Sequence, residues 1–296
     1  MLFAAWNDRQ PDRHELGWRS SWLRFEPVAL DAKGFGELRL AGAWTVTSDD
    51  PRFGGVSALA LSGNQLVALT DSGAVIRFAR PNRTRQLATI GELPDGPGAR
   101  GFKFNRDSEA LASDPLGRGW WVAFENRNEL WLYDPAFRRA LKRTRVRDAS
   151  LSQNRGVEGA TTSGAALLLV PEHGRSLIEW REGRPRTFPI ANPAGRIADV
   201  ASLPSGELLV VNRQASRRGF ANSLALLAGG ANAYTYTRRM ALGVGKLDNV
   251  EAVAPELLSG GRVRLWLMSD DNHQRPLRTL LIAVDLPARL PGRRPS

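Results

Sequence analysis

Acidic side chains recur at two regular places in this sequence, beside short apolar runs, and they are the groups best suited to do chemistry. Glu109, Glu158, Asp199 and Glu251 each open one such run, and an earlier run has Ser57 at this place. Further acids close the run that follows, at Asp71, Glu125, Glu172 and Asp270. Carboxylates gathered in one place bind a hard cation such as Ca²⁺, which takes roughly 6–8 oxygen ligands, or act as general acids and bases.

Basic residues stand next to several of these acids in the sequence. Lys103 and Arg106 precede Glu109, Arg155 precedes Glu158, and Arg213 closes the run that follows Asp199. We expect these four cations to receive an anionic group of a substrate. The predicted metal-ligating residues are Glu109, Glu125, Glu158, Glu172, Asp199, Glu251 and Asp270. The two histidines that follow closing residues, His173 and His273, are interpreted as exposed loop residues.

Five segments share one pattern, which must position these side chains. A polar residue opens each segment, an apolar run with small residues follows, and a turn containing Gly, Pro, Asn or Ser leads into a second apolar run and a closing polar residue. The segments are 54–73, 106–134, 154–174, 197–213 and 247–272. Short apolar runs bounded by turn residues predict strands joined in hairpins. A spacing of about 40–50 residues between repeats is typical of β-propeller blades.

The hairpin geometry predicts where the polar residues meet. In an antiparallel pair, the start of the first strand and the end of the second lie at the same end. If all units share one orientation, their opening and closing residues surround one mouth of the central channel. Carboxylates crowded together in this way must be neutralised by cations, by raised pKa values or by neighbouring Arg and Lys. We expect Asp71, Glu109, Glu125, Glu158, Glu172, Asp199, Glu251, Asp270 and Asp271 at this mouth. Structural roles at strand ends remain the alternative for any single one of them.

Further strand-like segments complete the predicted fold. Third strands are expected within 74–78, 129–133, 177–180 and 224–227, and the segment 141–147 predicts an exposed, cationic outer strand. The strand-like segments 37–46 and 279–286 near the two ends predict a sixth blade that closes the ring. We therefore expect an all-β, single six-bladed propeller over residues 25–286, with poorly ordered residues 1–24 and a flexible tail at 287–296.

Composition excludes several classes of protein. The chain has 41 Lys and Arg against 30 Asp and Glu, a net charge of +11; a bias in composition is the simplest explanation of this excess, and attraction of an anionic ligand is the functional alternative. No nucleic-acid-binding motif accompanies that charge, so a nucleic-acid partner is not expected. The absence of cysteine excludes thiolate catalysis, disulfides and zinc–thiolate sites. No apolar run is long enough to cross a membrane, and no nucleophile elbow, H-E-x-x-H or complete P-loop is present.

Several short motifs resemble the phytase-like family, also described as esterase-like activity of phytase. They occur in the family's order, from about residue 54 to residue 286. The sequence departs from the family pattern at three positions. Ala110 and Ala252 stand where the family has a glycine after the acid, and Ser57 stands where the family has an acid. The motifs are Asp107-Ser108-Glu109, the segment from Asn154 to Gly159, Glu172, Asn249-Val250-Glu251, and the segment from Ser269 to Asn272.

The resemblance implies a β-propeller and hydrolysis of an ester, with a phosphate ester and calcium as one form of it; members of the family are often exported. Our first hypothesis is a calcium-assisted hydrolase in which Glu158, Glu109 and Glu251 act as ligands or as the general base. The alternatives are a non-catalytic propeller that binds a ligand or a protein, and a lactone or carboxylic-ester hydrolase. We expect a monomer acting on a small anionic or ester substrate, in the periplasm or exported, although no signal peptide is recognisable and a cytoplasmic location stays open.

Overall fold

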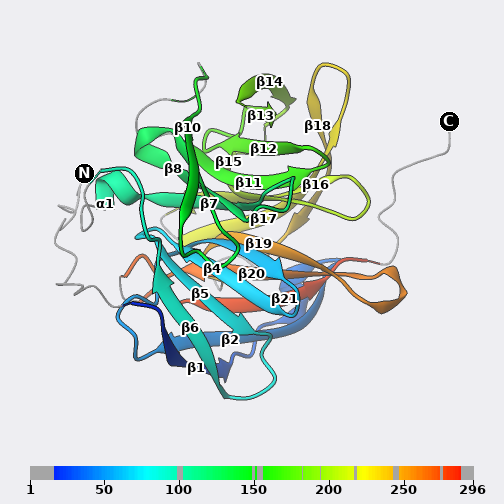
Figure 1. Cartoon of the computed structure of the whole chain (residues 1–296). Coiled ribbons are helices and arrows are strands. Elements are labelled where there is room, and N and C mark those ends of the chain that lie inside the picture. Colours follow the sequence, from blue (N-terminus) through cyan, green and yellow to red (C-terminus); the bar gives the residue numbers. More distant parts are fainter. Residues whose placement is uncertain are drawn as a thin grey trace.

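The chain folds almost entirely into antiparallel β-strands (Figure 1). The computed structural model describes residues 17–98, 103–148, 151, 156–181, 183–193, 195–216, 219–242, 247–273 and 276–287. Helical structure in the described part is limited to one turn of α-helix, α1 (Lys103–Arg106), and to 3₁₀ turns at Ala32–Phe35, Glu125–Arg127 and Ser259–Gly261. None of the helices in this part is long and apolar enough to cross a membrane.

Five four-stranded units follow one another along the described chain. The first contains β3 (Val56–Ser62), β4 (Gln65–Thr70), β5 (Ala74–Ala79) and β6 (Arg85–Glu92). The second contains β7 (Ser108–Ser113), β8 (Trp120–Phe124), β9 (Glu129–Tyr133) and β10 (Ala140–Arg145). The third contains β11 (Val157–Ser163), β12 (Ala166–Pro171), β13 (Ser176–Arg181) and β14 (Arg184–Ala191). The fourth contains β15 (Arg196–Ser202), β16 (Leu208–Ser216), β17 (Gly219–Gly229) and β18 (Tyr234–Ala241). All four predicted third strands and the cationic outer strand, β10, are confirmed.

The fifth unit is built from both ends of the chain. Its order is β19 (Asn249–Leu257), β20 (Val263–Asp270), β21 (Leu280–Asp285) and β2 (Arg39–Ser48). The expectation of six blades is therefore wrong for the described residues. The repeat at 247–272 supplies only two strands, so the two terminal strands complete it and do not form a further unit. Pairing of β2 with β21 joins the beginning of the chain to its end.

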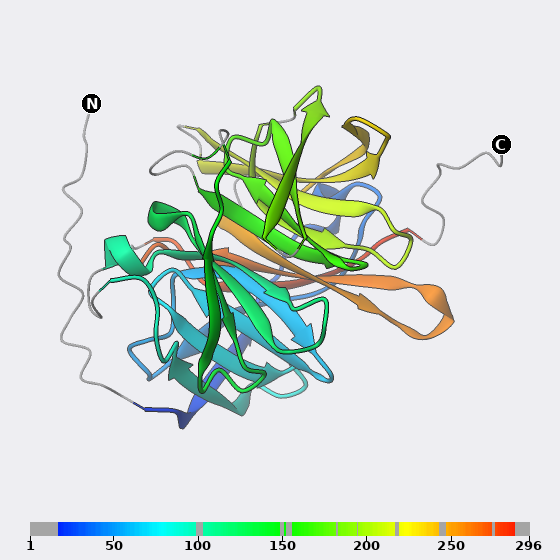
Figure 2. The ribbon, with the colours of Figure 1, turned by 45° about the horizontal axis from the view of Figure 1, so that its top comes forward.

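The first strands of the five units form a closed ring. Each packs against the first strand of the next unit, in the order β3, β7, β11, β15, β19 and back to β3. Five units arranged around this ring give the molecule the form of a five-bladed propeller. Figure 2 shows the first unit, in cyan, and the fourth unit, in yellow, on opposite sides of the molecule. Because neighbouring sheets cover both faces of each sheet, most residues of the second strands are buried, and β12 (Ala166–Pro171) is buried along its whole length. Gly159 of β11 allows a close approach, since a Cβ there would lie 2.8 Å from the backbone nitrogen of Val200 in β15.

Two outer contacts join neighbouring units at the rim of the propeller. Strand β1 (Arg19–Pro27) lies between β6 of the first unit and β2 of the fifth, and pairs with both (Figure 1). Strand β14 pairs in parallel with β18 of the next unit. The predicted domain boundary at residue 25 falls inside β1, so the expectation of poor order is wrong for Arg19–Arg24. Residues 1–16 and 288–296 lie outside the described part of the chain.

Candidate functional site

Each inner hairpin carries a β-bulge close to its opening residue. In the first unit, Val56 pairs with Thr70 and Ala58 pairs with Leu69, so that Ser57 is the extra residue. The same one-residue shift occurs in the other four hairpins. A bulge aims its side chain away from the regular alternation of the strand, and bulges are frequent beside functional sites. The bulged residues of the five units are Ser57, Glu109, Glu158, Ala198 and Glu251.

The opening and closing residues of each hairpin lie together, as the sequence predicts. The backbone N–H of Glu125 donates to the carbonyl of Asp107 over 2.9 Å, and that of Glu172 donates to the carbonyl of Gly156 over 3.3 Å. The remaining units repeat this arrangement: Asp71 donates to Gly55, Arg213 pairs with Arg196, and Asn249 pairs with Asp270. Five hairpins around one ring therefore present their polar ends at a common mouth.

Three carboxylates of the second unit form the most compact acidic group at this mouth. One oxygen each from Asp107, Glu109 and Glu125 lie within 4.8 Å of one another, and all three side chains are half-buried. The side-chain amide of Asn126 donates to Asp107 Oδ2 over 3.0 Å. Glu109 and Glu125 are among the metal ligands predicted from the sequence, whereas Asp107 is not. The signal that identifies Asp107 is its position at the opening of the hairpin, opposite the closing residue Glu125.

Burial and charge repulsion shift the pKa values of two acids on bulges. Burial raises the pKa of Glu109 well above its usual value, and the nearby charges of Asp107, Glu158 and Asp71 and a hydrogen bond with Asp107 raise it further. Burial raises the pKa of Glu158, which is 7% exposed, to about 8; the charge of Glu125 adds to this shift and Arg213 opposes it. Glu158 is therefore largely protonated at pH 7 and holds its proton beside the group of Asp107, Glu109 and Glu125.

The other side of the mouth carries a cation. Arg213 Nη1 donates to Glu251 Oε1 and, over 3.2 Å, to Asn249 Oδ1. The amide of Asn249 also donates to Glu251 Oε1. Glu251 thus has a cationic partner, whereas burial favours the protonated forms of Glu109 and Glu158. The three acids proposed for catalysis face a common mouth, and their environments separate them into two kinds.

Asp199 does not join the acidic group. The bulge of the fourth unit is at Ala198, so Asp199 belongs to the next position of β15 and faces the neighbouring strand. Its two carboxylate oxygens accept the backbone N–H groups of Val200 over 2.7 Å and of Val253 in β19 over 2.8 Å. Burial raises its pKa well above the usual value, against these two bonds. Asp199 therefore links the fourth and fifth units, and a role as a metal ligand at the mouth is not supported.

Three other acids near the mouth bind groups of the protein. Glu172 accepts Arg196 Nη1 over 2.6 Å, and its charge contributes to the raised pKa of Glu158. Asp270 accepts the backbone N–H of Asn272 over 2.7 Å, within the turn that follows β20. Asp271 accepts the backbone N–H of Gly55 over 3.0 Å, which joins the fifth unit to the first.

The four cations predicted to bind the substrate do not lie together in the described structure. Arg213 lies at the mouth, and the side chain of Arg106 packs against Gly96. The side chain of Lys103 and the whole of Arg155 lie outside the described residues. His273 lies beside Gly55 at the edge of the mouth, and His173 lines a separate pocket next to Glu172.

The raised pKa of Glu158 predicts a fall in stability with rising pH. Folded protein holds a proton that the unfolded chain releases near pH 4.5, so this contribution to folding is complete below pH 4.5 and is lost as pH rises through about 8. In buffer containing EDTA, we expect the Glu158→Gln variant to lose less of its Tm than the parent between pH 5 and pH 8.5. Glu179→Gln, on β13, the third strand of the same unit, is the control and should follow the parent. Equal slopes for the parent and Glu158→Gln would contradict the assignment.

Comparison with known proteins agrees with the fold and with the motifs. The family described as "Phytase-like: Esterase-like activity of phytase" matches residues 51–273, which include four of the five units and the inner strands of the fifth. Comparison with curated protein sequences finds no match.

Several solved structures are similar to this chain at low identity. Glutaminyl cyclase of Myxococcus xanthus has a TM-score of 0.50 and 12% identity, over 78% of this chain and 90% of that one. The structure of a nidogen/laminin complex has a TM-score of 0.47 and 12% identity, over 88% of this chain and 96% of that one. Hydrazine synthase of Kuenenia stuttgartiensis has a TM-score of 0.45 and 14% identity. The match covers 80% of this chain and 64% of the other, so this chain spans less than two thirds of that protein. At these identities the likeness concerns the fold alone.

Proposed function

Because the chain belongs to the phytase-like family, described as esterase-like activity of phytase, we propose that it is a calcium-assisted hydrolase of phosphate or other esters. The observation that carries the proposal is the contrast between two neighbouring sets of acids at the mouth. Asp107, Glu109 and Glu125 offer oxygens to a cation, and Glu158, with a pKa of about 8, holds a proton beside them.

The three carboxylates fit a calcium ion. Calcium–oxygen distances of about 2.4 Å allow two ligand oxygens to lie at most about 4.8 Å apart, and the three oxygens of the group lie within 4.8 Å of one another. All three are hard oxygen donors, as calcium or magnesium requires, with no nitrogen or sulfur ligand among them. Burial and repulsion from neighbouring carboxylates raise the pKa of Glu109, and a bound cation would relieve that repulsion. Bound there, calcium would supply positive charge to polarise an ester or phosphoryl oxygen.

The remaining side chains supply proton transfer and orientation. Glu158 donates its carboxyl proton to the oxygen of the departing alcohol, because a pKa of about 8 keeps that proton available at neutral pH. An ionised carboxylate of the mouth accepts a proton from the attacking water. Transfer of that proton to Glu158 afterwards restores both acids to their starting states. Arg213, fixed by Glu251 and Asn249, orients an anionic oxygen of the substrate.

A panel of esters tests this function directly. We expect hydrolysis of at least one phosphate, carboxylic or lactone ester that is lost in EDTA and restored by calcium. Calcium should also raise the Tm of the parent, with a smaller rise in Glu125→Gln and an unchanged rise in Glu179→Gln.

Each alternative function predicts a different result from the same panel. If the protein hydrolyses carboxylic esters or lactones faster than phosphate esters, then the substrate class is carboxylic esters or lactones and not phosphate esters. Turnover that EDTA leaves unchanged would remove calcium from the proposal. Absence of turnover on every ester would contradict hydrolysis and leave a propeller that binds its ligand at the same mouth.

A further inference from the structure

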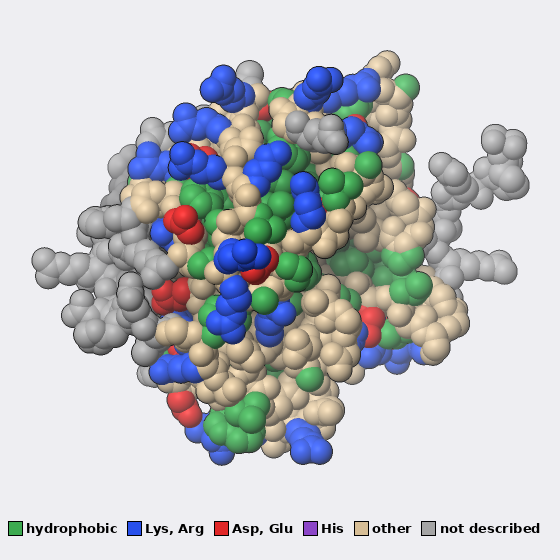
Figure 3. All heavy atoms as spheres, viewed as in Figure 1, with side chains coloured by type: hydrophobic (Ala, Val, Ile, Leu, Met, Phe, Trp, Pro, Cys, Tyr) green, Lys and Arg blue, Asp and Glu red, His purple; other side chains and the backbone are tan. Residues whose placement is uncertain are grey.

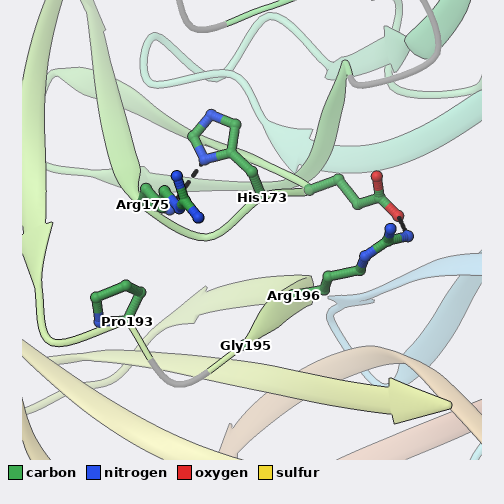
Figure 4. A pocket seen from close by; sticks show the side chains of 6 residues that line it. His173, Arg175, Pro193, Gly195 and Arg196 are labelled. Atoms are coloured by element: carbon green, nitrogen blue, oxygen red, sulfur yellow. Dashed lines mark hydrogen bonds and ion pairs between the residues drawn. The ribbon is translucent and has the colours of Figure 1, made fainter.

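A pocket of about 580 Å³ lies between the third and fourth units, next to the mouth. The turn between β12 and β13 forms one side, and the connection from β14 to β15 with the first residue of β15 forms the other (Figure 4). Pro193 and Gly195 belong to that connection. The residues that line the pocket are Glu172, His173, Arg175, Pro193, Gly195 and Arg196.

The backbone is shaped to keep the two sides together. Gly174 has a φ of +64°, and a Cβ there would lie 2.4 Å from the carbonyl oxygen of Gly195, so only glycine permits this approach. The backbone N–H of Ile197 donates to the carbonyl of Glu172 over 3.1 Å, which fixes the start of β15 against the end of β12. The pocket is therefore a built feature of the contact between two units.

The pocket carries an excess of positive charge. Arg196 of β15 pairs with Glu172 of the opposite turn, and Arg175 extends from the same turn as Glu172 (Figure 4). Within the described part of the chain, no carboxylate forms an ion pair with Arg175. The backbone N–H of Arg175 donates to His173 Nδ1 over 3.0 Å, and this bond stiffens the turn that presents the guanidinium. Lys and Arg side chains also crowd the outer face around β10 and β14, which attracts anions towards this part of the molecule (Figure 3).

We propose that this pocket is an anion subsite, in which Arg175 and Arg196 bind a phosphate or carboxylate group that is remote from the reacting ester. The proposal rests on the proposed function and names its substrate class: esters that carry a second anionic group. Glu172 belongs to both sites, since it pairs with Arg196 in the pocket and its charge acts on Glu158 at the mouth. Guanidinium groups recognise pairs of anionic oxygens by two parallel hydrogen bonds, so Arg175→Lys would not fully replace the native residue.

Binding of inorganic phosphate in EDTA isolates the subsite from the mouth. Without a cation, the mouth presents a group of carboxylates that repels phosphate, whereas the pocket keeps its arginines. We expect calorimetric titration to show phosphate binding by the parent, about tenfold weaker binding by Arg175→Gln, and unchanged binding by Arg184→Gln. Arg184, on the outer strand β14 of the same unit, is exposed, and its loss removes the same charge. A parallel titration with acetate tests whether a carboxylate is accepted as well as phosphate. Absence of phosphate binding by the parent, or equal weakening in both variants, would overturn the proposal.

Kinetics separate failure of the subsite from failure of the proposed function. For esters with a remote anionic group, Arg175→Gln should raise KM about tenfold with kcat retained, and neutral esters should show no change. Loss of phosphate binding in Arg175→Gln without any hydrolysis by the parent would support the subsite and contradict the hydrolase. Hydrolysis by the parent with an unaltered KM in the variant would support the hydrolase and overturn the subsite.

Discussion

Replacing Asp50 by alanine is expected to lower the free energy of unfolding by about 3–5 kcal/mol, because it leaves the charge of Arg52 buried and uncompensated. Both side chains are 0% exposed, and Arg52 donates to Asp50 from Nε over 3.0 Å and from Nη2 over 2.8 Å. Arg19 and Ser21 of β1 donate to the same carboxylate over 2.8 and 3.1 Å. Chemical denaturation of the parent and the variant measures the difference.

The buried pair of Asp50 and Arg52 anchors strand β1, which lies between the first and fifth units. Arg52 also donates to the carbonyls of Gly17 and, in β6, Ile90. Through these bonds Asp50 and Arg52 hold β1 between the first and fifth units. Burial alone would raise the pKa of Asp50, but the hydrogen bonds from Arg52 and Arg19 hold it far below its usual value. The stabilisation is therefore present above pH 3.8 and is lost as the pH falls further.

The neighbouring acid provides a matched control. Asp49 is 72% exposed and pairs over 3.3 Å with Arg24, which is also exposed. Surface pairs of this kind contribute about 0–1 kcal/mol, so Asp49→Ala should change stability by less than about 1 kcal/mol. The double variant Asp50→Leu with Arg52→Met should recover much of the loss, since it removes both charges. Equal effects of Asp49→Ala and Asp50→Ala would refute the role given to the buried pair.

The repeat could be read from the sequence because the inner hairpins are buried on both faces. Continuous apolar runs such as Leu66–Leu69 are bounded by turn residues, and their spacing reveals the propeller. The number of units could not be read in the same way. Strand pairing between β2 and β21 joins residues at opposite ends of the chain, and no local pattern shows whether such strands complete an existing unit or form a new one.

The limits at the site have a similar physical origin. The sequence could place Glu109, Glu125 and Glu158 near one another because all three stand at hairpin ends. Asp199 was placed at the mouth because an acid near the opening of a run looks equivalent whether it occupies the bulge or the next position. A shift of one residue turns a side chain to the other face of a strand, and hydrogen bonds to Val200 and Val253 then fix it there.

Replacing Glu158 by glutamine is expected to lower kcat by about 10²–10⁴, with calcium binding retained, if this residue is the proton donor. Glutamine keeps the shape and the burial of the side chain but cannot release a proton. The rate of the parent should fall as the pH rises through about 8, where Glu158 ionises, and this fall should be absent from the residual activity of the variant. Steady-state kinetics across pH 5–10, with calcium present, measure both effects.

A second acid of the mouth distinguishes proton transfer from metal binding. Glu109→Gln should lose both activity and calcium affinity, because Glu109 belongs to the group with Asp107 and Glu125, whereas Glu158→Gln should lose activity alone. Glu179→Gln should leave both properties unchanged. If Glu158→Gln keeps the activity of the parent, or loses calcium as Glu109→Gln does, then Glu158 is not the proton donor. The two roles separate because burial keeps a proton on Glu158, whereas a bound cation would displace protons from the neighbouring acids.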